Sequence, residues 1–303
     1  MLMPTRAQHR RLFLVAAPLL LIAALVPASL PLSVQIAAVA LLVAVLGLPH
    51  GALDPFMARR NGLPAGLKPL LAFVALYTLI ALAAFGAWVA MPVTVFVLFL
   101  AVSIWHFSDD WRPDLPRWLQ ILSAAAVVML PCLFYTERTG ALFALLTSAE
   151  AGPAIAGWIA WAAPALLAVL NLALATLAVR EEASWSSVAE VMLLQALGAA
   201  FSPLPFFIIY YCGIHSARHM IHCLHGLERN ALRQAGRDLT LYTAAAIAGI
   251  AALWGLFGGM DVDTGLMRMT FIGLFCLTIP HTLLMGWVGE YNQLENEKMM
   301  LMN

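Results

Sequence analysis

The sequence predicts an all-α integral membrane protein that crosses the bilayer about ten times. Of its 303 residues, 63% are hydrophobic and only 11% are charged, whereas soluble domains contain about 25% charged residues. The mean hydropathy is +0.89. Apolar runs long enough to span a membrane as helices recur along most of the chain. We therefore expect residues 1–303 to form a single integral membrane domain.

Prolines, glycines and charged residues divide the apolar sequence into candidate spans. The ten expected spans are 12–30, 32–49, 69–89, 92–107, 118–135, 154–179, 186–202, 204–226, 239–257 and 267–289. Only Ser202-Pro203-Leu204-Pro205 separates the seventh span from the eighth. A proline kink there would merge the two, so eight or nine spans are the alternatives.

The basic residues favour ten spans with the N-terminus in the cytoplasm, because cytoplasmic loops are enriched in Lys and Arg. In that arrangement only Arg138 and Arg268 fall outside, whereas merging the seventh and eighth spans would also move Arg229, Arg233 and Arg237 outside. The 16 basic residues balance 16 acidic ones, which suggests no nucleic-acid partner. We expect a multi-pass protein of the bacterial or archaeal inner membrane, with the lipid bilayer as its surroundings.

Five histidines lie within or at the ends of the apolar spans, where polar rings are costly and usually functional. They are His50, His106, His215, His219 and His281. On the expected topology, four different spans place them at a similar depth near the cytoplasmic side. His215 and His219 are four residues apart, which puts both rings on one face of a helix. Imidazole is a ligand for Zn, Cu, Fe and Ni. We therefore expect a metal site formed by His50, His106, His215 and His219.

Two carboxylates are expected to support this site. Asp54 follows His50 by four residues and Asp109 follows His106 by three. Each could accept the N–H of the ring nitrogen that faces away from the metal and so fix the orientation of the ring. Arg218 is the basic residue within a span. Asp54 and Asp109 are both candidate partners for it, and extension to the membrane interface is the alternative.

These motifs resemble the Brp/Blh family of membrane-bound β-carotene 15,15′-dioxygenases. The resemblance rests on Pro49-His50-Gly51-Ala52-Leu53-Asp54, on Trp105-His106-Phe107 with Asp109, on His215-Ser216-Ala217-Arg218-His219 and on Pro280-His281. It implies an Fe(2+) enzyme that cleaves the central double bond of β-carotene with O2 to give two molecules of retinal. By position, His50, His106, His215 and His219 correspond to the iron ligands, and His281 is a fifth candidate. Because retinal is the chromophore of microbial rhodopsins, a functional link to a rhodopsin is also implied.

Aromatic residues near the histidines are candidates for a substrate tunnel, because flat rings can pack against a polyene and stabilise a cationic intermediate. The candidates are Trp105, Phe107, Phe207, Tyr210, Tyr211, Phe271 and Phe275. No catalytic residue beyond the metal site is expected.

Two other functions remain open at this stage. A membrane hydroxylase or desaturase with two irons would use more histidines, in HxxxH and HxxHH clusters, and this chain has one HxxxH, His215 to His219. A metal or proton transporter could also bury histidines. The histidines here gather on one side of the membrane, and the repeated Pro-His dipeptide is the single hint of internal duplication.

Overall fold

The computed structural model describes residues 5–25, 30–112, 114–252, 254 and 260–302, with side chains as far as residue 289. Helices account for the secondary structure in this part of the chain. The elements are α1 (Arg6–Ala24), α2 (Leu32–Leu42), η1 (Val43–Gly47), α3 (Leu48–Gly51), α4 (Asp54–Arg60), α5 (Leu67–Ala90), α6 (Pro92–Phe107), η2 (Ser108–Trp111), α7 (Arg117–Phe134), α8 (Thr136–Leu146), α9 (Ala151–Val179), α10 (Trp185–Ala200), α11 (Pro203–Tyr210), η3 (Tyr211–Ser216), α12 (Ala217–Leu224), α13 (Arg229–Ala252) and α14 (Val262–Met302). The predicted all-α class is confirmed.

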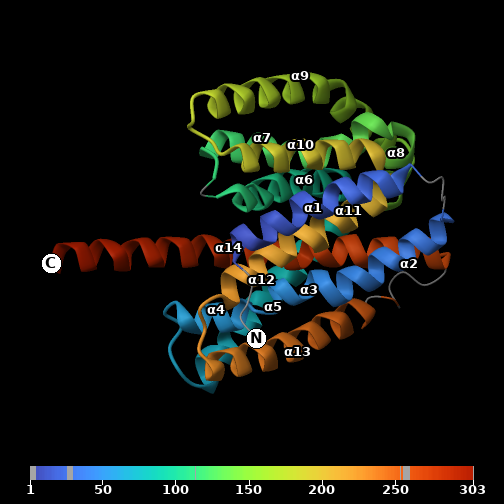
Figure 1. Cartoon of the computed structure of the whole chain (residues 1–303). Coiled ribbons are helices and arrows are strands. Elements are labelled where there is room, and N and C mark those ends of the chain that lie inside the picture. The colour runs from blue at the N-terminus through green and yellow to red at the C-terminus, as the bar shows by residue number, and fades with distance from the viewer. Residues whose placement is uncertain (1–4, 26–29, 113, 253, 255–259, 303) are drawn as a thin grey trace.

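The helices form a layered bundle. Figure 1 shows α9 at one edge and α13 at the opposite edge, with α7 and α10 forming the layer beneath α9. The helix α14 runs through the middle of the bundle and packs against α2, α5 and α8. Apolar side chains buried between the helices form the core. The segments α3 and α6, which carry His50 and His106, also contact α14, which carries His281.

Among the described residues, seven helical segments are long and apolar enough to cross a membrane. They are Arg6–Ala24, Leu32–Arg60, Leu67–Ala90, Pro92–Trp111, Arg117–Phe134, Ala151–Val179 and Val262–Gly289. The other three expected spans coincide with α10, with α11 to α12, and with α13. Residues 26–29, at the end of the first expected span, and residues 253 and 255–257, in the ninth, lie outside the described part of the chain. The count of ten is thus approximate.

Two helices contain a π-helical turn next to a histidine. One is η1, which ends at Gly47 just before Pro49 and His50, and the other is η3, which contains His215. Pro49 has no N–H to donate to the carbonyl one turn earlier, which breaks the regular hydrogen-bond ladder. Such π turns are frequent at functional sites. Both therefore mark the region of the chain where function is expected.

The two π turns touch each other at a glycine. A Cβ added to Gly47 would lie 2.7 Å from a ring carbon of Tyr211, the first residue of η3. Only glycine leaves room for so close a ring at this position. This contact sets how closely the segment bearing His50 approaches the segment bearing His215.

Candidate metal centre

Five histidine side chains converge in the interior from five helical segments. The ring of His50 lies 5.2 Å from those of His215 and His281 and 5.4 Å from that of His219, measured between centroids. The ring of His106 lies 4.7 Å from that of His215 and 4.8 Å from that of His281. All of the sequence-predicted ligands, including His281, are therefore brought together.

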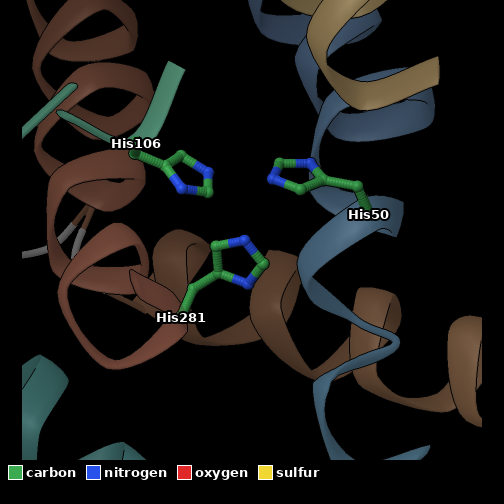
Figure 2. Close-up of side chains that lie close together, drawn as sticks. All are labelled: His50, His106 and His281. Carbon is green, nitrogen blue, oxygen red and sulfur yellow. The ribbon is translucent and has the colours of Figure 1, made fainter. Parts of the chain in front are cut away.

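One possible group of metal donors is His50, His106 and His281. One ring nitrogen from each lies within 4.8 Å of the other two. Figure 2 shows the three rings facing a common centre from three separate segments. All three side chains are buried, with 3–7% of each residue exposed. His281, which the sequence offered only as a fifth candidate, thus lies at the centre of the group.

A second possible donor set is Asp54, His219 and His281. Two histidines and one carboxylate are a common Fe(II) ligand set. The oxygens of Asp54 are engaged elsewhere, however: they lie 2.8 and 3.0 Å from Nδ1 of His281, and one accepts a hydrogen bond of 2.8 Å from the Tyr77 hydroxyl. These bonds suit a carboxylate that orients His281 better than one that shares a metal with it.

Several ring nitrogens are available for a metal. The Nε2 atoms of His106, His215 and His281 are buried and have no hydrogen-bond partner among the described residues. Buried polar atoms are nearly always paired, so three such orphans in one cluster need an occupant. Neutral imidazoles suit Fe, Zn, Cu and Ni. The cluster therefore fits a divalent transition metal, and its donor set alone does not choose among them.

Hydrogen bonds fix which nitrogen faces inward. Nδ1 of His215 lies 3.2 Å from a carboxylate oxygen of Asp110, which leaves Nε2 for the cluster. Nδ1 of His50 lies 2.5 Å from the carbonyl oxygen of Gly47 and 3.3 Å from the Ser216 hydroxyl. A donor bond from one ring nitrogen leaves the other as the free base that a metal requires. Three histidines are therefore oriented by partners outside the cluster.

The structure corrects the expectation for Asp109. This side chain is 47% exposed and pairs with Arg112 and Arg117, at 3.2 and 2.7 Å. It does not reach His106; instead its neighbour Asp110 points inward to His215. The reason is local: α6, which carries His106, ends at Phe107, and a separate 3₁₀ turn follows over Ser108–Trp111. The α-helix does not continue as far as Asp109, so the helical face that the prediction assumed for His106 and Asp109 does not exist.

The remaining histidines have different surroundings. Nε2 of His219 lies 3.3 Å from Sγ of Cys223, although its ring is 5.0 Å from that of His281. His219 is therefore the expected ligand that is least oriented toward the cluster. His222 and His225 are exposed, and His9 contacts the Gly213 carbonyl at 3.0 Å.

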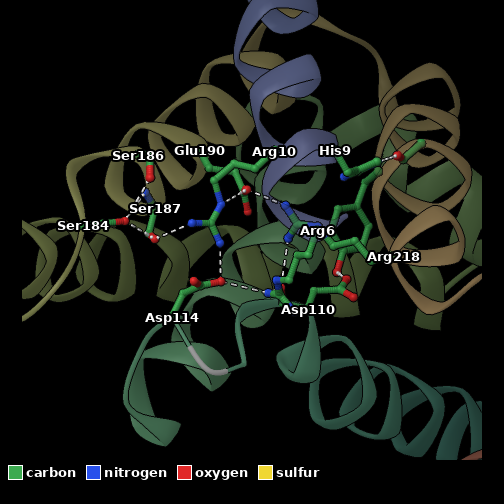
Figure 3. Close-up of polar contacts among 12 residues, drawn as sticks. Arg6, His9, Arg10, Asp110, Asp114, Ser184, Ser186, Ser187, Glu190 and Arg218 are labelled. Atoms are coloured by element: carbon green, nitrogen blue, oxygen red, sulfur yellow. Dashed lines mark hydrogen bonds and ion pairs between the residues drawn. The ribbon is translucent and has the colours of Figure 1, made fainter. Parts of the chain in front are cut away.

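A buried network of charged side chains lies next to Asp110, the carboxylate that contacts His215. Arg218 donates to the carboxylate of Glu190 and to the main-chain carbonyl of Asp110. Arg10 of α1 also donates to Glu190, at 3.1 Å, and Arg6 donates to the Asp110 carbonyl. Figure 3 shows these side chains meeting between α1 and the segment that carries Asp110. The partner of Arg218 is thus Glu190, and neither Asp54 nor Asp109 pairs with it.

Two cavities lie beside the cluster. The larger, about 300 Å³, is a groove bounded by α5, α13 and α14, and its lining includes His50, Asp54, Tyr77 and His281. The smaller, about 140 Å³, is lined almost wholly by apolar side chains, several of them phenylalanines, from α6, α7, α8, α11 and α14. Apolar cavities beside a few convergent polar groups are typical of binding sites.

The aromatic tunnel candidates divide between these places. Four of them, Phe107, Phe207, Tyr210 and Phe271, line the smaller cavity. Tyr211 lines the groove. Trp105 does neither: it is 57% exposed and lies beneath the guanidinium of Arg117. Phe275 also lines neither cavity and packs against Trp88 and Phe99. These last two placements differ from the sequence prediction.

Sequence reasoning missed four polar residues near the site: Asp110, Tyr77, Ser216 and Glu190. A signal existed for one of them, because Glu190 is an acidic residue inside the expected span 186–202 and is completely buried. An ionisable residue in a span calls for a partner, and Arg218 was the matching cation. Asp110 and Ser216 depend on a 3₁₀ turn and a π turn, and Tyr77 depends on a contact between α5 and Asp54, none of which periodicity describes.

Comparison with known proteins agrees with the site. The family model described as Beta-carotene 15,15′-dioxygenase matches residues 41–289, which include all five clustered histidines. A curated protein of an uncultured marine bacterium, 66A03, named Beta-carotene 15,15′-dioxygenase, is 29% identical over 261 residues, covering 82% of this chain and 91% of the relative. No solved structure matches the chain. With the family model extending over most of its length, this chain belongs to the β-carotene 15,15′-dioxygenase family.

Proposed function

We propose that this protein is a non-heme Fe(II) oxygenase that cleaves the central 15,15′ double bond of β-carotene with O2 to give two molecules of all-trans retinal. In this reaction one C=C bond is broken and each of its carbons gains one oxygen atom, so one O2 accounts for both products. Family membership and the name of the curated relative support the reaction class. The histidine cluster supports a metal as the agent.

The observation that carries the proposal is the group of buried, unpartnered ring nitrogens that face one another. The unpartnered atoms are Nε2 of His106, His215 and His281. His50, His106 and His281 would hold the iron, with His215 beside them. Neutral histidine ligands leave Fe(II) with its charge and with open positions. The bound iron would supply the electrons that activate O2, while the protein supplies orientation and a dry cavity.

The chain's own residues have clear tasks in this scheme. Asp54 and Asp110 hold His281 and His215 by their Nδ1 atoms, so that Nε2 faces the cluster. Apolar walls exclude water from the groove and from the smaller cavity. A dry site prevents side reactions of a reactive intermediate. A hydrocarbon substrate dissolved in the bilayer could reach such a site without passing through water.

Expression in a β-carotene-producing bacterial host tests the reaction. We expect the wild-type protein to bleach the colour of the cells and to yield retinal on chromatography, and ¹⁸O2 to label both retinal molecules. His106→Ala should keep the host coloured, whereas the exposed His222→Ala should bleach like the wild type. A coloured host despite iron-loaded wild-type protein would reject the proposed substrate.

Iron content separates this proposal from the hydroxylase alternative. We expect one iron per chain in protein purified without oxygen, because the two possible donor sets among the described residues share His281. Two irons per chain, lost together in His281→Ala, would favour a di-iron oxygenase. Any physiological link to a microbial rhodopsin would follow from retinal as the product and needs no contact between the two proteins.

A further inference from the structure

We propose that the groove between α5 and α13 is a lateral binding site that takes one half of a long, uncharged polyene directly from the bilayer. The inference rests on the proposed function, because the histidines at the groove would act on the middle of that polyene. It adds the place of binding and the route of access.

The groove has two helical walls and a floor. Residues 73–85 of α5 form one wall, residues 242–250 of α13 form the other, and residues 273–281 of α14 form the floor. At a rise of 1.5 Å per residue, the α5 wall is about 18 Å long. Only 6% of the α5 span is buried within the protein, so this helix faces lipid. The shape suits an extended chain that arrives sideways.

Small residues keep the groove open. Its walls include Ala81 on α5 and Ala245, Ala246 and Gly249 on α13. A Cβ added to Gly249 would meet no atom within 4 Å, so the space in front of this glycine is empty. Larger side chains on these wall positions would fill the volume that an occupant needs.

The lining chemistry selects an uncharged occupant. No Lys or Arg is among the residues that line the groove, while Asp54 is. A phospholipid headgroup or a fatty-acid carboxylate would find no cation to pair with there, and its burial would be costly. Alkyl and aromatic side chains make up most of the lining. A neutral hydrocarbon such as a carotenoid therefore fits better than an acyl lipid.

The smaller apolar cavity lies on the other side of a partition from the groove. It is separated from the groove by two stacked rings, Tyr211 on the groove side and Phe207 on the cavity side, with centroids 5.0 Å apart. The ring of Tyr211 lies 5.8 Å from that of His50. A chain that passes this partition would hold its middle beside the histidines. Rotation of the two rings would open the passage.

The test measures binding separately from turnover. Wild-type protein and Gly249→Phe are purified without oxygen from a carotenoid-producing host, and carotenoid, iron and phospholipid are measured per chain. We expect Gly249→Phe to carry at least about five-fold less carotenoid, the lower range for overfilling a packed site, with its iron unchanged. The matched control is Gly86→Phe, which lies on α5 in equally open space but does not line the groove.

The outcomes are distinguishable. If Gly249→Phe and Gly86→Phe carried the same amount of carotenoid per chain, the proposal that the groove binds carotenoid would be wrong. It would also be wrong if Gly249→Phe lost bound phospholipid while its carotenoid content stayed unchanged. If Gly249→Phe fails to fold, as judged by lost iron, Gly249→Leu against Gly86→Leu repeats the comparison with a smaller side chain. If the wild-type protein bound carotenoid but made no retinal when O2 was admitted, the proposed reaction would be rejected. The proposal that the groove binds carotenoid would still hold.

Discussion

The two carboxylates beside the histidine cluster make similar bonds in different surroundings. Asp54 lies within 2.8 Å of Nδ1 of His281 and accepts from the Tyr77 hydroxyl, while Asp110 lies 3.2 Å from Nδ1 of His215 and accepts from the Tyr210 hydroxyl. We call these the Asp54 side and the Asp110 side. Each combines a histidine, an aspartate and a tyrosine.

The surroundings of the two sides differ. The Asp110 side is fixed by Arg6 and Arg218, which both donate to the Asp110 carbonyl. On the Asp54 side, Asp54 and Tyr77 both line the groove. Buried charge networks are rigid because any loss leaves a charge unpaired. Asp110 is therefore held in place by the charge network, while the Asp54 carboxylate also lines the groove.

Removal of a cluster histidine should have the largest effect on either side. We expect His281→Ala and His215→Ala each to lower iron affinity by more than about 100-fold, beyond the range for residues that only orient a ligand. Metal analysis of protein purified without oxygen measures this. If His215→Ala kept its full iron content, His215 would not be a metal ligand. Asp110 would then have no ligand to orient, and the proposed role of the Asp110 side would be wrong.

Removal of the negative charge should separate the two sides. We expect Asp54→Asn and Asp110→Asn each to lower iron affinity by about 10- to 100-fold. In iron-saturated protein, Asp54→Asn should also raise KM for β-carotene, because this side chain lines the groove, while Asp110→Asn should change kcat alone. An unchanged KM in Asp54→Asn would contradict the assignment of that side to the substrate.

The charge network should matter for stability more than for substrate binding. Glu190 is fully buried between Arg10 and Arg218, and removal of one partner of such a pair costs about 3–5 kcal/mol. We therefore expect Glu190→Gln to lower the thermal unfolding temperature clearly and iron affinity only modestly, with KM unchanged. The exposed ion pair of Asp109 with Arg117 provides the control: Asp109→Asn should leave the unfolding temperature nearly unchanged.

The tyrosine hydroxyls should give the smallest effects. Tyr77→Phe and Tyr210→Phe each remove one hydrogen bond to a carboxylate, worth about 1.5–3 kcal/mol at most. We expect a modest loss of iron affinity in both variants. Because Tyr77 lines the groove and Tyr210 lines the smaller cavity, KM for β-carotene should change in both. Titration of the purified variants with iron, followed by steady-state kinetics, checks both quantities. Unchanged iron affinity in both variants would contradict a role for these hydroxyls in holding the two aspartates.

Much of this arrangement was predictable from the sequence. Composition gave the all-α membrane class, and the rarity of histidine in apolar spans gave the cluster, because both depend on the cost of polar groups in hydrocarbon. The partners were harder. Asp54 was expected beside His50, but the turn at residues 52–53 between α3 and α4 redirects it to His281. Asp109 was expected beside His106, but the 3₁₀ turn brings Asp110 inward instead.

Both errors have one physical source. The spacing rules assume an uninterrupted α-helix, in which residues three or four apart share a face. The chain departs from that geometry at the motifs of His50, His106 and His215, through a turn, a 3₁₀ segment or a π turn. The ring contacts between distant segments, such as that of His106 with His281, also lie beyond what periodicity describes. Contacts between segments that are distant in the sequence depend on how the helices pack, which the spacing of residues within one helix does not determine.

The π turns η1 and η3 limit how this centre could be grafted onto another scaffold. Each residue of an α-helix advances the chain by about 100° around the axis, so deletion of one residue from either turn would swing everything after it to a new face. His50 follows η1 and His219 follows η3. If the same histidine spacings were placed on ideal α-helices, the sequence of the motif would be kept, but the histidine side chains would point in different directions and would not converge.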